Sequence, residues 1–315
     1  MHILKGYTKQ EISWMMYDWA NSAHSVIIVT LLPIFFDTVA GYTADSVSSM
    51  STWGYATSIA MLIVALAAPF LGVFGDIRGM RKKLFSFFML LGVAACAGMA
   101  FTPGMDFTSG PVAAGKVASL ILVLYIVSVI GFDASAIYYD AFLTDVTTED
   151  RMDKVSTMGY GLGYIGGSTI PLLIFLIMNL VGVPMLTCLA FVFGLTAVWW
   201  LAFSLPLLKN CEQTSGKPYE KGDVARSIKG VGTTIKEIIA NKPMLIYILS
   251  YFFYIDGVHT VISMATTYGT NLGLDSTGMM LALLLVQILG LPFCLLYIKC
   301  SEKFGARTMV GFGIC

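Results

Sequence analysis

Six ionisable side chains lie inside long apolar stretches of this 315-residue sequence. They are Asp18, His24, Asp133, Asp140, Asp256 and His259. An acidic side chain at the centre of a bilayer costs about 2.5 to 3.5 kcal/mol on insertion scales, so we expect these groups to face a wet interior rather than lipid. A carboxylate beside an imidazole in a partly desolvated cavity holds and releases a proton near neutral pH. These residue types therefore favour the binding of a proton or a solute.

Helical spacing places most of these residues on a common face with other polar side chains. His24 is less favourably placed, because it lies about 120° from Asp18 around a helix. For Asp256 and His259 two interpretations stay open, a proton-binding pair or a locked pair that fixes helix packing. For Asp18 and Asn21 they are substrate contact or an interhelical hydrogen bond. The polar stripes are Asp18, Asn21, Ser22 and Ser25; Asp256, His259, Thr260 and Ser263; and Asp133 with Asp140.

The composition indicates a membrane protein. Hydrophobic residues make up 57% of the chain and charged residues 12%, whereas a soluble domain carries about 25% charged residues. Nineteen basic residues balance nineteen acidic ones, so no net field attracts nucleic acid. Six scattered cysteines in so apolar a chain do not form a disulfide framework. We expect no cofactor, no metal ion and no catalytic residue.

Eight apolar stretches are long enough to cross a bilayer, since a spanning helix needs about 20 residues. A β-barrel is excluded, because its strands would be alternating segments of about ten residues. The first stretch is no signal peptide, because it is longer than the usual core and carries polar groups. We expect an all-α membrane protein with eight visible transmembrane helices. They are Ile12–Phe36, Trp53–Phe74, Leu84–Phe101, Val117–Phe142, Val155–Leu180, Met185–Leu208, Met244–Tyr268 and Met279–Ile298.

The basic residues predict the orientation, because they concentrate on the cytoplasmic side of membrane proteins. With the N-terminus in the cytoplasm, 18 of the 19 basic residues face inside and Lys116 faces out. A missed or false span would scramble this asymmetry. The asymmetry therefore also supports the number of spans.

A polar segment divides the chain into three parts. Residues 1–208 form a six-helix bundle, residues 209–243 a cytoplasmic linker, and residues 244–315 an incomplete second bundle. The linker is predicted to contain an amphipathic helix on the inner membrane face, with a solvated linker as the alternative. The chain stops within an apolar stretch too short to cross, which predicts a C-terminal truncation. The apolar stripe of the linker is Val224, Ile228, Val231, Ile235 and Ile238, and Arg226, Lys229 and Lys236 lie off it.

The two bundles share short internal similarities, as in folds built from repeats. In span one Tyr17 and Asp18 precede the letters HSVI, and in span seven Tyr254 and Asp256 precede HTVI. The loops after spans two and eight also match in part. Both matches fall at corresponding places, which indicates a repeated bundle.

The loop between spans two and three carries the most specific local motif, GVFGDIRGMRKK, which begins at Gly72. Gly72 is expected to permit close helix approach, Asp76 to cap or pair at a helix end, and Gly79 to allow a tight turn. Arg81 and Lys82 are expected to face anionic headgroups and acidic partners. An ordinary positive-inside loop is the alternative.

This loop resembles the signature of the major facilitator superfamily. The segments YDWANSA and YDAFL, together with the glycine-rich run of residues 159–167, are similar to the "unknown major facilitator" family, which includes autophagy-related vacuolar amino-acid effluxers. The likeness covers the whole chain, although Asp140 and Thr144 stand where that family usually has an amide and a proline. It implies a major facilitator fold whose first, fourth and seventh helices line a central cavity. It also implies that residues 72–82 form a cytoplasmic gate.

The glycine-rich run formally matches a dinucleotide-binding fingerprint at Gly161, Gly163 and Gly166. That motif needs a preceding strand and a soluble crossover unit, which this chain lacks. We therefore interpret Gly159, Gly163 and Gly167 as a face for close helix packing.

The resemblance implies a secondary transporter that moves a small solute, amino acids first, driven by a proton or cation gradient. Its partners would be the solute, the coupling ion and the bilayer, and we expect a monomer. It would lie in the inner (cell) membrane of a bacterium or the vacuolar membrane of a fungus. No Lys or Arg lies inside a predicted span, which favours neutral, cationic or zwitterionic solutes. The alternatives are a non-transporting scaffold or sensor, and a lipid-acting enzyme, for which no catalytic motif is present.

Overall fold

The computed structural model describes residues 4–43, 46–216, 218 and 223–314, and the regular elements among them are helical. In chain order they are α1 Lys9–Ala40, α2 Ser46–Gly75, α3 Arg81–Met99, the 3₁₀ turn η1 Thr102–Gly104, α4 Pro111–Val146, the 3₁₀ turn η2 Glu149–Arg151, α5 Met152–Gly163, the π-helix η3 Tyr164–Thr169, α6 Ile170–Leu180, α7 Met185–Asn210, α8 Asp223–Ala240, α9 Lys242–Asn271, α10 Ser276–Phe304 and α11 Ala306–Ile314. Among these residues the expectation of an all-α protein is confirmed.

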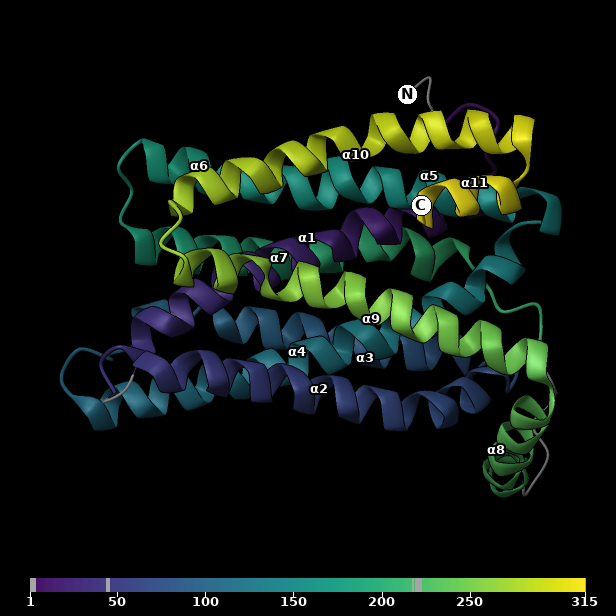
Figure 1. Cartoon of the computed structure of the whole chain (residues 1–315), viewed down its shortest axis with the longest axis horizontal. Helices are drawn as coiled ribbons and strands as arrows, with labels where there is room; N and C mark the ends of the chain where they lie inside the picture. The colour runs from purple at the N-terminus through teal and green to yellow at the C-terminus, as the bar shows by residue number, and fades with distance from the viewer. Residues whose placement is uncertain (1–3, 44–45, 217, 219–222, 315) are drawn as a thin grey trace.

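Eight helical segments of the described chain are long and apolar enough to cross a membrane, which confirms the eight expected spans. The long helices run side by side, and α8 crosses one end of the bundle (Figure 1). Thr8 caps α1 in a capping box with Glu11, and Pro111 occupies the first turn of α4. The 36 residues of α4 extend about 54 Å, well beyond a hydrocarbon core of about 30 Å, so its ends reach water.

Helix α1 is the central helix of the first six spans, because it packs against α4, α5 and α7. Its side chains Trp14, Tyr17 and Ile27 are at most 2% exposed. Helices α3 and α4 approach closely where Gly92 meets Gly131, since a Cβ on Gly131 would lie 2.5 Å from the Gly92 nitrogen. Small residues at such contacts let membrane helices pack tightly. The polar residues of α1 and α4 therefore sit on a firmly packed frame.

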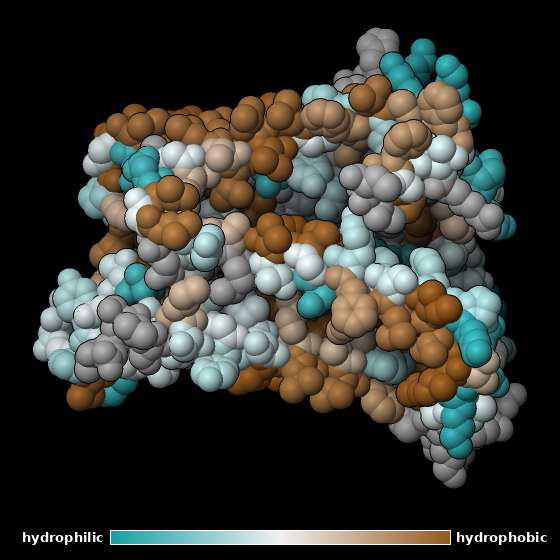
Figure 2. Space-filling view, viewed as in Figure 1, coloured by the Kyte–Doolittle hydropathy of each residue, from teal (hydrophilic) through white to brown (hydrophobic). Residues whose placement is uncertain are grey.

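Apolar side chains also cover much of the outer surface. Tyr55 and Leu66 of α2 and Phe253 of α9 are 65% to 71% exposed, and hydrophobic residues spread over broad areas in Figure 2. None of the described residues from Lys242 to Ile262 in α9 is buried. Apolar patches of this extent are unusual on water-exposed proteins and mark contact with a membrane or with other helices. The surface thus supports an environment of lipid.

The fifth span differs from the single helix that we expected. It consists of α5, the π-helix η3 and α6. The π turn falls at the glycine-rich run, where a Cβ on Gly166 would run into the ring of Trp19. Such single π turns disturb a regular α-helix and are frequent at functional sites. The absence of side chains at Gly166 and Gly167 lets η3 lie directly against α1.

The linker contains a helix, α8, as predicted. Ile235 is 48% exposed and Ile238 half-buried. The side chains of Val224, Arg226, Ile228 and Lys229 lie outside the described residues, so the proposed lipid-facing stripe stays a prediction. After Gly305, whose φ is +82°, the chain continues as α11.

Candidate functional site

The carboxylate of Asp18 lies where α1, α4 and α5 meet. The hydroxyl of Tyr139 on α4 donates a hydrogen bond of 2.7 Å to Asp18 Oδ2. A Cβ on Gly159 of α5 would lie 2.5 Å from the same oxygen, so only glycine leaves room for the carboxylate there. Asp18 is half-buried. The interhelical hydrogen bond that the sequence left open for Asp18 is present.

Beside Asp18, a chain of polar groups crosses the interior of the first six spans. Tyr17 and Ser135 share a hydrogen bond of 2.8 Å, and the indole N–H of Trp200 on α7 donates to the Tyr17 hydroxyl at 3.4 Å. Asn21 lies beside Tyr17 and is 8% exposed. These hydrogen-bonded groups link α1, α4 and α7 in an apolar surrounding, where each hydrogen bond is strengthened.

His24 lies deeper in the same bundle and is 3% exposed. Its ring stacks on Phe132 of α4 at 4.8 Å between centroids and lies 5.1 Å from Trp200 of α7. Neither ring nitrogen has a hydrogen-bond partner among the described residues. The structure therefore surrounds His24 with aromatic rings and does not bring it into hydrogen-bonding contact with Asp18.

Two further carboxylates project from α4. Asp133 is half-buried and its Oδ2 has no hydrogen-bond partner in the described part of the chain. Asp140 is exposed and lies near enough to Asp18 for their charges to interact. The side chains of Asp18, Asp133 and Asp140 form no ion pair with any described basic residue. The first and fourth spans thus carry three acidic groups without cationic partners.

Asp256 and His259 of α9 stand apart from this group. Both side chains are exposed. They form neither an ion pair nor a hydrogen bond with each other or with other described residues. The locked pair that the sequence left open as one of two interpretations is not formed among the described residues, where α9 packs against few neighbours.

The glycine face of the fifth span is confirmed. A Cβ on Gly163 would lie 2.5 Å from Ser22 Oγ, and one on Gly167 would lie 2.9 Å from the Ala23 nitrogen. Both contacts are to α1, four and five residues along from Asp18. The glycines therefore hold η3 and α5 against the polar stripe of α1, as close packing requires.

The glycines and the acid of the loop between α2 and α3 fill some of their expected roles and not others. Gly79 has φ +81° and makes the tight turn, and Asp76 Oδ1 lies 4.0 Å from an Arg81 nitrogen. A Cβ on Gly72, however, would meet none of the described atoms within 4 Å, so the expected close approach is wrong there. The close approach occurs at Gly75 instead, where an added Cβ would lie 3.0 Å from the ring of Tyr138.

Arg81 is buried rather than turned toward lipid headgroups, and its side chain is 5% exposed. Its guanidinium pairs with Asp145 of α4, whose side chain is fully buried, and donates to the Ala141 carbonyl at 3.0 Å. The expected acidic partner of Arg81 is therefore present, but the prediction that Arg81 faces lipid headgroups is wrong. Lys82 donates to the Cys211 carbonyl at 3.1 Å.

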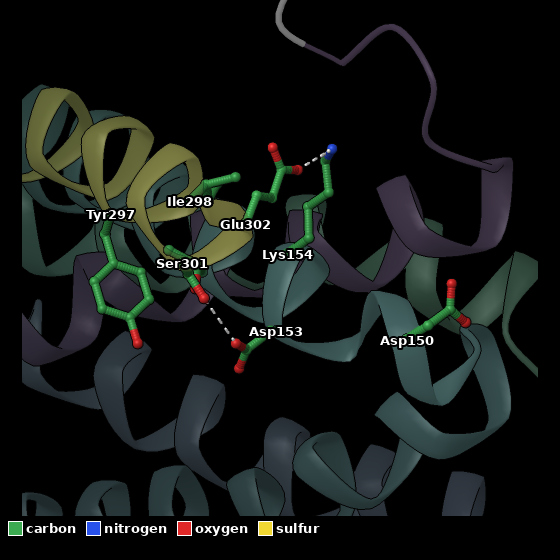
Figure 3. Close-up of a pocket in the computed structure, with 8 residues that line it drawn as sticks. Asp150, Asp153, Lys154, Tyr297, Ile298, Ser301 and Glu302 are labelled. Atoms are coloured by element: carbon green, nitrogen blue, oxygen red, sulfur yellow. Dashed lines mark hydrogen bonds and ion pairs between the residues drawn. The ribbon is translucent and has the colours of Figure 1, made fainter. Parts of the chain in front are cut away.

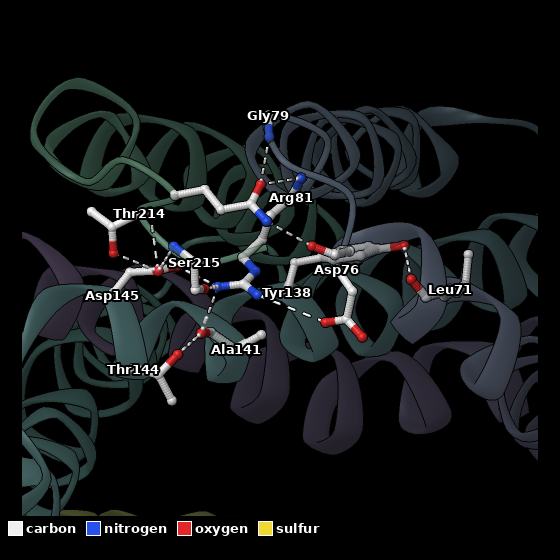
Figure 4. A network of polar contacts seen from close by, with 12 residues as sticks. Leu71, Asp76, Gly79, Arg81, Tyr138, Ala141, Thr144, Asp145, Thr214 and Ser215 are labelled. Carbon is white, nitrogen blue, oxygen red and sulfur yellow. Dashed lines mark hydrogen bonds and ion pairs between the residues drawn. The ribbon is translucent and has the colours of Figure 1, made fainter. Parts of the chain in front are cut away.

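The residues after α7 complete this cluster and were not expected from the sequence. The Gln213 side chain bonds to the Gly79 nitrogen at 2.8 Å and to the Gly75 carbonyl at 2.9 Å. Asp145 also accepts from the backbone of Thr214 and Ser215 (Figure 4). Burial raises the pKa of the Cys211 thiol to about 12, so the thiol is neutral. We call residues 211–216 the strap, because they fasten the linker to the loop.

A second buried acid was also missed. Glu11 is 1% exposed and accepts bidentate bonds of 2.8 and 2.9 Å from Arg151. Thr147 adds a hydrogen bond of 2.7 Å to the same carboxylate. Together they tie the start of α1 to the end of α4 and to η2. The capping-box pattern of Thr8 and Glu11 was the available sequence signal.

Helices α5 and α10 meet around a cavity of about 200 Å³ (Figure 3). Lys154 pairs with Glu302 at 2.8 Å, and Ser301 donates to Asp153 at 3.2 Å. Further along the seam, the Tyr164 ring packs directly on Gly290. These contacts join the block of the first six spans to the part of the chain after the linker. In the described residues no group of three His, Cys, Asp or Glu side chains could hold a metal ion.

Residues 39–315 match the family model described as "Vacuole effluxer Atg22 like". The chain belongs to this Atg22-like family. It is 39% identical over 320 residues to the "Uncharacterized MFS-type transporter YxiO" of Bacillus subtilis, a match that covers 99% of this chain and 72% of the relative. It is 24% identical to "Autophagy-related protein 22-1" of Sclerotinia sclerotiorum over 49% of this chain, which spans only 29% of that fungal protein.

Solved structures agree with this family. The crystal structure of a D-xylose-proton symporter matches 94% of this Atg22-like chain and 69% of its own, with a TM-score of 0.64 and 17% identity. The partially occluded inward-open xylose transporter XylE of E. coli gives a TM-score of 0.61 at 15% identity. At such identity the likeness shows the fold alone. The major facilitator fold and the family resemblance are confirmed, and this Atg22-like chain is a transporter of the major facilitator type rather than an enzyme.

Proposed function

We propose that this chain is a secondary active transporter that moves a small solute by alternating access, coupled to a proton or another cation. The observation that carries the coupling is the set of carboxylates on α1 and α4, Asp18, Asp133 and Asp140, which have no basic partner among the described residues. An unpaired acid within a membrane is costly and marks ion or substrate pathways. A proton or a cationic group would satisfy this demand.

Amino acids are the first candidate substrates, because the family model is named for vacuole effluxers and the resemblance includes amino-acid effluxers. The predicted spans hold no Lys or Arg, which disfavours strongly anionic solutes. Asn21, His24, Asp256 and His259 remain candidates for substrate or ion contact. Residues 72–82 remain the candidate cytoplasmic gate.

Alternating access would require two bundles that rock against each other. We assign residues 1–208 to the first bundle, 209–243 to the linker and 244–315 to the second. The seam between α5 and α10 supports this division, since its contacts join the two parts across a cavity. We expect a monomer with its N-terminus in the cytoplasm, placed in the cell membrane if the protein is bacterial like its Bacillus subtilis relative.

The test is transport into liposomes that contain the full-length protein. Uptake of a radiolabelled amino-acid mixture should follow an imposed pH gradient, and Asp18→Asn and Asp256→Asn should abolish the dependence on the gradient. Asp106→Asn, in the exposed loop before α4, is the matched control and should transport normally.

Flux that ignores the gradient and survives both substitutions would refute the coupled mechanism. Ligand-dependent stabilisation without any flux would instead favour a scaffold or sensor. The orientation is tested separately with reporter fusions, which should place the N-terminus inside and the loop of Lys116 outside.

A further inference from the structure

Two aromatic residues hold the Asp18 carboxylate in place. The Trp14 indole stacks on the Tyr139 ring with centroids 4.3 Å apart and planes 13° from parallel. The Trp14 N–H also donates to the Tyr139 carbonyl at 2.9 Å. Trp14 is 2% exposed and Tyr139 4% exposed. The Tyr139 ring is therefore fixed by a stack and by a hydrogen bond at its own backbone.

The fixed ring points its hydroxyl at Asp18. The donor meets Oδ2 at 2.7 Å, the usual length of an O–H···O hydrogen bond. A hydrogen bond to the charged form of a carboxyl favours that form. Because Gly159 leaves no space for a larger side chain beside Oδ2, the carboxylate is held on both sides.

Few other groups influence Asp18. The titratable groups that face it are Tyr139 and Asp140 on α4 and Tyr17 on its own helix, while α5 presents Gly159. No described basic side chain bonds to Asp18. Among the described residues, the Tyr139 hydroxyl is thus the side-chain group that donates a hydrogen bond to Asp18.

We propose that Tyr139, held by Trp14, is the positioning residue that sets when Asp18 takes up and releases the coupled proton. This inference rests on the proposed function, because it assumes that Asp18 is a coupling group. Breaking the Tyr139 bond leaves Asp18 in place but makes it retain its proton to higher pH. A role in helix packing alone would leave the protonation of Asp18 unchanged.

The experiment measures protonation directly, with dicyclohexylcarbodiimide as the probe. A protonated carboxyl adds to a C=N bond of the carbodiimide: its oxygen bonds to carbon, its proton goes to nitrogen, and acyl migration gives a stable N-acylurea. Labelling of Asp18 in the nanodisc-embedded protein is quantified by peptide mass spectrometry across a pH series. Tyr139→Phe should raise the pH of half-labelling by about one unit or more, since hydrogen bonds to charged groups are worth about 1.5 to 3 kcal/mol.

Tyr138→Phe is the matched control, because the neighbouring hydroxyl donates to the Leu71 carbonyl rather than to a carboxylate. It should leave the labelling profile of Asp18 unchanged. Trp14→Phe keeps a ring for stacking but removes the N–H, and it should move the profile in the same direction by less. If Tyr139→Phe does not fold, Trp14→Phe carries the test.

Identical profiles for the wild type, Tyr139→Phe and Trp14→Phe would overturn the proposal. An equal shift in Tyr138→Phe would also overturn it, because the effect would then be general to the packing of α4. The labelling profile does not depend on transport, so a failure of the proposed function in liposomes is distinguishable from a failure of this inference.

Discussion

The end of the molecule that holds Arg81 and the interior of the first six spans carry charge in opposite ways. At that end, Arg81 pairs with Asp145 and Glu11 with Arg151, and both acids are almost completely buried. In the interior, Asp18 and Asp133 have no basic partner among the described residues. One region neutralises its charges within the protein, and the other leaves them without a basic partner among the described residues.

This difference separates structural charges from functional ones. The loss of one partner of a buried ion pair destabilises a protein strongly, because the remaining charge is then buried without a partner. An unpaired acid costs free energy in every state of the protein, so its presence indicates a role beyond packing. Substitutions at the two regions should therefore change stability in opposite directions.

The largest loss of stability is expected from Arg81→Ala. It strands the buried carboxylate of Asp145 and should lower the free energy of unfolding by about 3 to 5 kcal/mol. Unfolding in detergent micelles, followed by circular dichroism, measures this. Arg78→Ala removes an exposed arginine of the same loop and should change stability by less than about 0.5 kcal/mol. Equal effects of the two substitutions would mean that the Arg81 pair is not special.

Glu11→Gln should have the next largest effect. The Glu11 side chain is 1% exposed but its partner Arg151 is 34% exposed, so the stranded arginine can be solvated. A loss of about 1 to 3 kcal/mol is expected from the broken charged hydrogen bonds. Glu149→Gln, an exposed acid of η2, serves as the control in the same unfolding assay. A neutral result for Glu11→Gln would show that the capping box alone holds the start of α1.

Asp133→Asn should act in the opposite direction. Neutralisation of an unpaired carboxylate removes a desolvation cost, so stability should stay the same or rise by up to about 1 kcal/mol. Gradient-driven transport in liposomes should fall in the same variant. A loss of stability comparable to that of Glu11→Gln would contradict the division into paired structural and unpaired functional acids.

Lys154→Ala should have the smallest effect. The side chains of Lys154 and Glu302 are 43% and 57% exposed, and exposed ion pairs contribute about 0 to 1 kcal/mol. A double-mutant cycle with Glu302→Gln, measured at low salt and at 1 M salt, isolates the pair. A coupling energy that persists at high salt would place this pair with the buried ones.

The fold was largely predictable from the sequence, since long apolar runs indicate the spans and clusters of basic residues indicate the connections between them. The glycine face of the fifth span was also predictable, because spacing alone puts Gly159, Gly163 and Gly167 on one side. The π turn was not, because it depends on the Trp19 ring that lies against Gly166. That contact joins residues far apart in the chain.

The sequence was enough to predict which acids belong to the candidate site, but not which residues contact them. Asp18 stood out as an acid in an apolar run, whereas Tyr139 was noticed only as part of a family motif. Asp145 and Glu11 lie just outside the predicted spans, so the cost of an acid within the membrane did not mark them as candidates. Their pairing with Arg81 and Arg151 spans 64 and 140 residues, a distance that periodicity cannot bridge.

The strap shortens the free part of the connection between the two proposed bundles. Residues 211–216 are bonded to the loop of Gly79 and to Asp145, so any tether begins after Gly216 rather than at the end of α7. Helix α8, with 18 residues, adds a stiff rod of about 27 Å. If the proposed second bundle moves against the first, a connection that consists largely of bonded chain and helix transmits that motion to the Arg81 cluster.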